Sequence, residues 1–153
     1  MTLQIDDVRE TFAMLDAWED RYRYLIDLGR ELEGLQENER VEAHRVRGCA
    51  SQVWVVTDQE THDGVTQLRF RGDSDAHIVK GLVALVLAYY SGHSPEAILN
   101  RDIAPLFKEL GLAEHLTPQR ANGVRAMVER IRRDAAQVSA FALCRPCAAS
   151  FKP

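Results

Sequence analysis

The chain has 153 residues, and 46% of them are apolar, which is enough material for one domain with a single core. Its 19 basic and 23 acidic side chains leave a formal net charge of -4, so the overall charge does not favour nucleic acid as a partner. The longest apolar run, Leu82 to Tyr90, is far shorter than the roughly 20 residues that span a bilayer. The opening "MTLQIDDVRE" has no targeting pattern. We therefore expect a soluble, cytoplasmic protein that binds neither nucleic acid nor membrane.

Two helices are predicted at the amino-terminal end. A short helical pattern covers residues 6–15, and residues 16–32 place their leucine and aromatic side chains near one helical face. Asp16 is the expected N-cap of the second helix. The following segment, residues 33–48, has little periodicity and is interpreted as an extended polar connection.

The period of the apolar residues then changes from that of a helix to that of a strand. Residues 51–60 and 64–72 are rich in Val, Thr, Trp and Phe, and "THDG" between them is typical of a turn. This pattern predicts a β-hairpin.

The next helix is predicted within residues 72–92. Ser74 is its expected N-cap and Gly92 its expected end, and its second half is apolar on nearly all sides. A helix of that kind is buried, so we expect it to lie at the centre of the core.

Three further helices complete the predicted fold. Residues 94–100 and 117–136 each begin with a hydroxyl residue followed by Pro, which is typical of a capped helix start, and residues 105–112 form a short helix with a Gly break. The order of helices, hairpin and helices predicts an α+β fold with a small antiparallel β-sheet packed against several α-helices.

The composition changes after Ala136, where charges and the helical stripe are lost. We predict one domain over residues 1–136 and a disordered tail over residues 137–153. The tail contains Cys144 and Cys147 in a C-x-x-C arrangement, which can be redox-active or half of a zinc site. No second such pair completes a zinc site in the sequence, and three cysteines are too few for a disulfide framework, so we expect reduced thiols.

The third cysteine, Cys49, has a setting that admits two interpretations. It lies between Gly48 and Ala50, where a polar connection meets a strand, and a cysteine at a loop tip is accessible. His44, Arg45 and Arg47 bring positive charge close to it, which would favour the thiolate. A lone cysteine is also commonly a small buried hydrophobic residue. Local spacing leaves the choice between reagent and packing residue open.

Three segments of the chain resemble, in order and spacing, the motifs of the SufE family of sulfur-acceptor proteins. They are "RVRGCASQVW", "GDSDAHIVKGLVALVLAYYSGHSPEAIL" and "GLAEHLTPQRANGVRAMVERI", and the resemblance covers residues 6–136. It implies a SufE/IscU-like fold. It also implies that the protein stimulates a cysteine desulfurase, accepts its persulfide sulfur on Cys49 and delivers that sulfur for iron–sulfur cluster assembly.

The resemblance also implies what the chain leaves to its partner. Carbon–sulfur cleavage belongs to the pyridoxal phosphate of the desulfurase, so no cofactor of this chain's own is expected, and the protein is a carrier and activator rather than a stand-alone enzyme. The Cys49 loop is expected to rest against an apolar hollow built from Val53, Trp54 and the helix after Ser74. Beyond the desulfurase, an iron–sulfur scaffold complex is an expected partner, and the chain is either a monomer or a homodimer.

Five further residues are candidates for partner binding or loop support, namely Gly48, Ser51, Asp73, Asp75 and Arg120. The hairpin should return the two aspartates to the end of the sheet that carries Cys49. Their alternative role is that of turn and helix-cap residues, and a solvated side chain is the alternative for the arginine. Both alternatives stay open.

Two other functions remain for comparison. The first is a binding module that stimulates a desulfurase without carrying sulfur. The second is a metal or iron–sulfur scaffold that uses Cys49 with Cys144 and Cys147.

Overall fold

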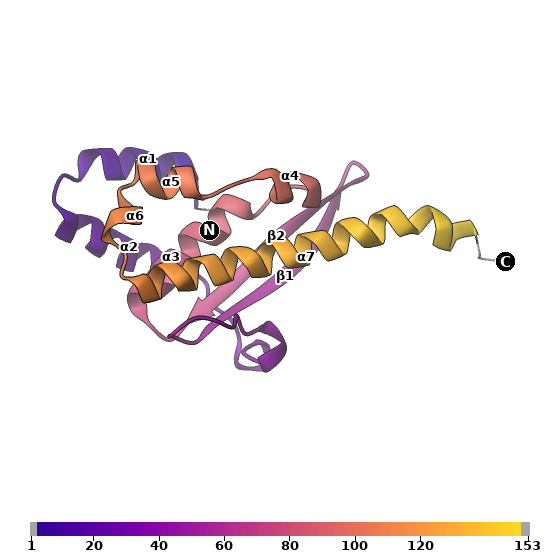
Figure 1. Cartoon of the computed structure of the whole chain (residues 1–153), viewed down its shortest axis with the longest axis horizontal. Coiled ribbons are helices and arrows are strands. Elements are labelled where there is room, and N and C mark those ends of the chain that lie inside the picture. The colour runs from indigo at the N-terminus through magenta and orange to yellow at the C-terminus, as the bar shows by residue number, and fades with distance from the viewer. Residues whose placement is uncertain (1–2, 151–153) are drawn as a thin grey trace.

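The computed structural model describes the backbone of residues 3–150 and the side chains of residues 3–139. The helices in chain order are α1 (Ile5–Met14), α2 (Trp18–Glu31), α3 (His77–Tyr90), α4 (Pro95–Asn100), α5 (Ala104–Glu109), α6 (Leu112–His115) and α7 (Pro118–Ser150) (Figure 1). Two short 3-10 helices, η1 (Glu37–Glu39) and η2 (Glu42–His44), precede the strands β1 (Val53–His62) and β2 (Val65–Ser74). This α+β arrangement confirms the predicted fold class.

The two strands form an antiparallel hairpin whose register runs from Val53 opposite Ser74 to His62 opposite Val65. Asp63 and Gly64 connect them and have φ angles of 52° and 78°. Two consecutive residues with positive φ are the requirement of a type I′ turn, and Asp-Gly is a preferred pair for it. The predicted hairpin is confirmed.

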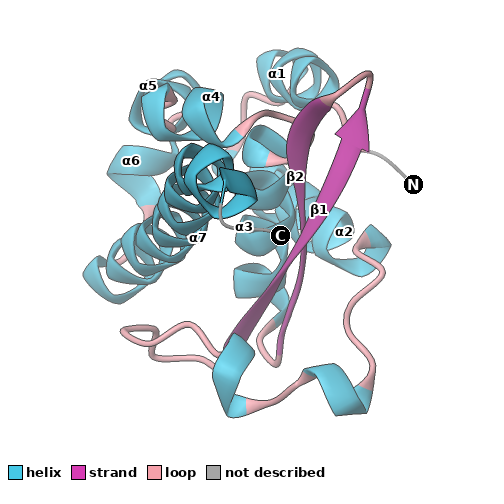
Figure 2. Ribbon diagram, turned by 90° about the vertical axis from the view of Figure 1, so that its right-hand side faces the viewer, coloured by secondary structure: helices cyan, strands magenta, loops and turns pink. Residues whose placement is uncertain are grey.

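Helix α3 is the centre of the core, as its apolar sequence predicts. All seven residues from Gly81 to Leu87 are buried, and the helix lies between α2, the hairpin and α7 (Figure 2). The close approach of α2 depends on Gly81, because a side chain there would collide with the backbone carbonyl of Leu25. The helix therefore gives the sheet a rigid support along its length.

Capping predictions succeeded for two helices. The hydroxyl of Ser94 accepts a hydrogen bond from the amide of Ala97 at 3.2 Å, and that of Thr117 accepts one from the amide of Arg120 at 3.3 Å. Each hydroxyl stands directly before the proline that opens its helix, α4 or α7.

Two other capping predictions were wrong. Helix α2 begins at Trp18 after Ala17, so Asp16 is not its cap. Ser74 is the last residue of β2, three positions before α3 begins, and its hydroxyl donates to the carbonyl of Gln52 at 2.8 Å. A contact across the sheet thus uses the hydroxyl that local sequence assigned to the helix.

The change of composition after Ala136 does not end a helix, because the backbone of α7 continues to Ser150. The division of the chain at this position stays a prediction, and the side chains of Cys144 and Cys147 lie outside the described residues. In the part of the chain that the structure describes, no helix is both long and apolar enough to cross a membrane.

Candidate functional site

Cys49 lies in a loop between η2 and β1. The base of the loop is closed by a hydrogen bond from the amide of Val46 to the carbonyl of Val53 at 2.8 Å, and Arg45 pairs with Trp54 just outside it. Gly48 has a φ of 93°, a conformation that a residue with a side chain rarely adopts. In Figure 2 the loop turns from η2 towards the first part of α7.

The Cys49 thiol rests against α7. The cysteine is half-buried, and its Sγ donates a long hydrogen bond of 3.5 Å to the carbonyl oxygen of Gly123. A Cβ built on Gly48 would be 3.4 Å from the Cβ of Ala126, one turn further along the same helix. The loop tip therefore packs on a small-residue surface of α7 through weak contacts.

A hollow of about 250 Å³ lies beside the thiol. It is lined by Cys49, Ala50 and Ser51 of the loop, Ala76, Ile78, Val79 and Leu82 at the start of α3, and Thr117, Gln119, Arg120, Gly123 and Met127 at the start of α7. The polar side chains of the lining are those of Ser51, Thr117, Gln119 and Arg120, and most of the other lining residues are apolar. A second sulfur atom attached to the thiol would have both room and an apolar contact surface here.

The predicted hollow was right for one wall and wrong for the other. The first turns of α3 contribute as expected, but Val53 is fully buried and Trp54 does not line the hollow. The second wall comes from α7. Because its small residues lie far along the chain from Cys49, no local pattern connects them.

Burial raises the pKa of the Cys49 thiol. The prediction that neighbouring basic residues favour the thiolate is thus wrong for the loop at rest. Arg47 forms an ion pair with Glu42 at 2.8 Å, and the Nδ1 of His44 is 2.8 Å from the carbonyl oxygen of Glu39. Their polar groups are used within the segment that precedes the loop.

The two aspartates of "GDSD" have different surroundings. Asp75 is exposed and its carboxylate accepts a hydrogen bond from the amide of Gln52 at 3.1 Å, at the end of the Cys49 loop. Asp73 is only 1% exposed, and its Oδ2 accepts from the guanidinium of Arg40 at 2.6 Å and from the amide of Leu35 at 3.1 Å. In this arrangement Asp75 supports the loop directly, and Asp73 ties the preceding connection to the sheet.

The Asp73 carboxylate stays ionised despite its burial. Its other oxygen accepts from the amide of Ser74 at 2.8 Å and lies 3.3 Å from the ammonium of Lys80. Burial pushes the pKa of Asp73 upward, but the amides of Leu35 and Ser74 and the charges of Arg40 and Lys80 outweigh it and leave the pKa lowered.

The remaining predicted residues lie beside the thiol. Ser51 and Arg120 both line the hollow. Arg120 comes from the first turn of α7, and its guanidinium donates to the hydroxyl of Tyr22 at 3.2 Å. Gly123 and Ala126 were not predicted, although a glycine within a helix costs about 1 kcal/mol and usually marks a close packing contact.

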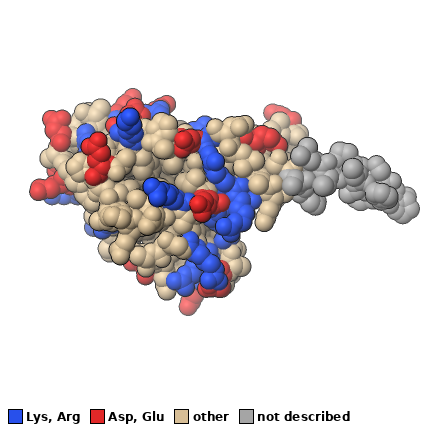
Figure 3. Space-filling model, viewed as in Figure 1, with Lys and Arg blue, Asp and Glu red and all other residues tan. Residues whose placement is uncertain are grey.

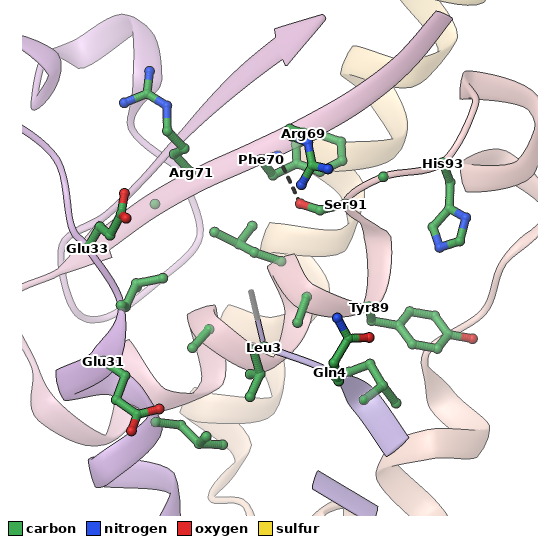
Figure 4. A pocket seen from close by; sticks show the side chains of 18 of the residues that line it. Leu3, Gln4, Glu31, Glu33, Arg69, Phe70, Arg71, Tyr89, Ser91 and His93 are labelled. Carbon is green, nitrogen blue, oxygen red and sulfur yellow. Dashed lines mark hydrogen bonds between the residues drawn. The ribbon is translucent and has the colours of Figure 1, made fainter. Parts of the chain in front are cut away.

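A larger hollow of about 760 Å³ lies elsewhere, between the start of the chain, the end of α2, β2 and the end of α3. Figure 4 shows Glu31, Glu33, Arg69 and Arg71 near it, with the amide of Phe70 hydrogen bonded to the hydroxyl of Ser91. None of the predicted site residues lines this hollow. Within the described residues, no group of three or more His, Cys, Asp or Glu side chains could hold a metal ion.

Comparison with known proteins identifies the family. The family model "SufE: Fe-S metabolism associated domain" matches residues 6–135. The chain belongs to the SufE family. An uncharacterized SufE-like protein of Rhizobium meliloti (strain 1021) is 49% identical over 131 residues, which cover 86% of this chain and 94% of that protein. A SufE-like protein of Rhizobium etli, also uncharacterized, is 50% identical over 131 residues, or 86% and 88% of the two chains.

A solved structure has a similar fold. The solution structure of a hypothetical protein from Thermus thermophilus matches with a TM-score of 0.64 and 27% identity, over 87% of this chain and 93% of that one. The predicted SufE resemblance and fold are therefore confirmed, and the chain is placed among proteins associated with iron–sulfur metabolism.

Proposed function

We propose that this SufE family member accepts sulfane sulfur from the persulfide of a cysteine desulfurase, stores it on Cys49 and delivers it for iron–sulfur cluster assembly. The observation that carries the proposal is the position of the thiol. Cys49 is the one cysteine of the family-matched residues 6–135, and it lies at a loop tip with its sulfur against an apolar hollow.

The transfer is a displacement at sulfur. The thiolate of Cys49 attacks the terminal sulfur of the desulfurase persulfide, a new S–S bond forms, and the desulfurase cysteine leaves as its thiolate. No electron is gained or lost overall, so neither a metal nor a redox cofactor on this chain is required. Cleavage of the carbon–sulfur bond of free cysteine is assigned to the pyridoxal phosphate of the partner.

The resting geometry explains how a reactive group is kept inactive. The hollow withdraws the thiol from water and raises its pKa, so little nucleophilic thiolate is present. Among the polar contacts of the described residues, only the long bond to Gly123 holds the sulfur there. Docking of the desulfurase is expected to draw the tip outward, where the pKa of the thiol falls and the thiolate can attack.

The proposal is tested by incubating the protein with a cysteine desulfurase and cysteine, followed by intact-mass analysis and peptide mapping. We expect an adduct of one or more sulfur atoms on Cys49 and none in Cys49→Ser. A Cys144→Ser, Cys147→Ser double variant is the matched control and should accept sulfur as the parent does. A sulfur adduct on Cys49→Ser would contradict the assignment of the carrier role to Cys49. If that variant accepts no sulfur but still stimulates the desulfurase, the protein is a non-carrying activator.

A further inference from the structure

The Cys49 loop has a stem, residues 43–46 and 52–53, that is hydrogen bonded to three parts of the structure. Within the stem, the amide of Val46 donates to the carbonyl of Val53. At its far side, the carbonyl of Gln52 accepts from the hydroxyl of Ser74, and the amide of Gln52 donates to Asp75. These contacts connect the stem to β1 and to the segment before α3. The third connection is to α7.

That third connection is made by one arginine, Arg130. Its Nη2 donates to the carbonyl of Ala43 at 3.1 Å and its Nη1 to the carbonyl of Arg45 at 3.4 Å, so one guanidinium bonds to two residues of the stem. The side chain is 18% exposed, as is that of its ion-pair partner Asp134, one turn later on α7. Partly buried, charge-assisted hydrogen bonds are the stronger kind in proteins.

Asp134 extends this contact to the sheet. Its Oδ2 accepts from the Nε of Arg130 at 3.2 Å and from the hydroxyl of Thr57, on β1, at 2.7 Å. Arg130 is thereby held by Asp134 in the orientation that reaches both carbonyls. Helix, strand and loop stem form one hydrogen-bonded unit.

We infer that Arg130 is a positioning residue that fixes the stem of the Cys49 loop, so that a docking partner moves only the tip, residues 47–51. The contrast with the tip supports this inference. Cys49 has one hydrogen bond at 3.5 Å, and Gly48 and Ala50 are exposed, whereas the stem has charged and backbone bonds of 2.8–3.4 Å. A docking partner will displace first the residues that have the weakest contacts with the rest of the protein.

The consequence for sulfur transfer rests on the proposed function. A tip that moves on a fixed stem loses little conformational freedom when a partner binds it, because the stem is ordered beforehand. Loss of Arg130 should therefore weaken productive docking more than it slows transfer once the complex has formed.

The test compares Arg130→Ala and Arg130→Lys with Arg133→Ala. Arginines are frequent along this helix, and Arg133 is an exposed one three residues later. Lys and Arg side chains lie across the middle of the face that Figure 3 shows. Hydrogen exchange of the Val46 amide reports directly on the stem. We expect about tenfold faster exchange in Arg130→Ala, a smaller increase in Arg130→Lys and none in Arg133→Ala, with thermal unfolding of all three close to the parent.

Two results would overturn the inference. One is Val46 exchange in Arg130→Ala that equals that of Arg133→Ala. The other is faster exchange at every amide of the chain, which would show a general loss of stability. Both are hydrogen-exchange measurements that need no desulfurase. They therefore test the structural role of Arg130 even if the proposed function is wrong.

The expected effect of Arg130 on docking is tested by titrating the parent and the Arg130→Ala variant into a desulfurase assay. For Arg130→Ala we expect the half-saturating concentration to rise roughly three- to tenfold while the maximal rate stays within about twofold of the parent. A maximal rate that falls by more than about twofold, with or without a rise in the half-saturating concentration, would contradict positioning through the stem.

Discussion

The thiol of Cys49 and the carboxylate of Asp73 are both withdrawn from solvent near the same end of the sheet, yet the protein holds them in opposite ways. Asp73 receives two backbone amides and two cationic side chains, at distances from 2.6 to 3.3 Å. Among the described residues, Cys49 makes a single side-chain hydrogen bond, which its thiol donates at 3.5 Å. The carboxylate belongs to the rigid frame of the molecule, and the thiol lies on a loop tip with far fewer polar contacts.

The pKa values of Asp73 and Cys49 shift in opposite directions for the same reason. Hydrogen bonds and cations lower the pKa of Asp73 despite its burial, so that group is ionised and paired. No such partner of Cys49 lies in the described part of the chain, and burial raises its pKa and favours the neutral thiol. Strong polar contacts thus hold the frame, and one long hydrogen bond holds the thiol.

The largest expected effect is loss of the frame in Asp73→Asn. A neutral amide cannot balance Arg40 and Lys80, so we expect the free energy of unfolding at pH 7 to fall by about 2–4 kcal/mol in urea denaturation. The exposed Asp27→Asn on α2 is the control and should change it by less than about 0.5 kcal/mol.

The pH dependence of that difference tests its cause. Because the folded-state pKa of Asp73 is lowered, its contribution is fully present above the unfolded value of about 3.9 and is lost as pH falls through the folded pKa. The difference in the free energy of unfolding between the parent and Asp73→Asn should therefore be largest near neutral pH and should disappear in acid. A difference that stays constant with pH would mean that the charge of the Asp73 carboxylate does not contribute to stability.

The next effect concerns the weakly held side of the comparison. In Gly123→Val the added methyl groups point into the space of Cys49, since a Cβ there would already be 3.5 Å from its Sγ. We expect the tip to be displaced and alkylation of Cys49 by iodoacetamide, followed by peptide mapping, to speed up by about tenfold. Gly123→Ala, which makes only ordinary contact, should stay within about twofold. Slower alkylation of the valine variant would show that the loop closes further over the thiol.

The sequence predicted those parts of the fold that depend on neighbouring residues. The Asp63–Gly64 turn, the buried face of α3 and the caps at Ser94 and Thr117 are all local signals, and the structure confirms each. Ser74 was assigned to a helix cap because its distant partner, the carbonyl of Gln52 across the sheet, leaves no trace in local spacing.

In the candidate site, too, the local features were predictable from the sequence and the contacts between distant residues were not. Cys49 could be found from its motif, but its protonation could not, because the α7 wall that buries it is built from Gly123 and Ala126. Counting nearby charges also misled, since Arg47 is paired with Glu42. That pairing was visible in the sequence as an opposite charge shortly before the arginine. The contacts of Arg130 to two backbone carbonyls have no sequence signature.

The smallest expected effect is the pH profile of alkylation at Cys49. In the parent, the rate should rise with pH and reach half its maximum above about 8.5, the ordinary thiol value, because the buried neutral form persists. In Gly123→Val the exposed thiol should titrate closer to that ordinary value, so the two profiles converge at high pH and diverge most near neutrality. If both variants share one midpoint, burial in the hollow does not set the protonation of Cys49, and the proposed release of the thiolate by docking loses its physical basis.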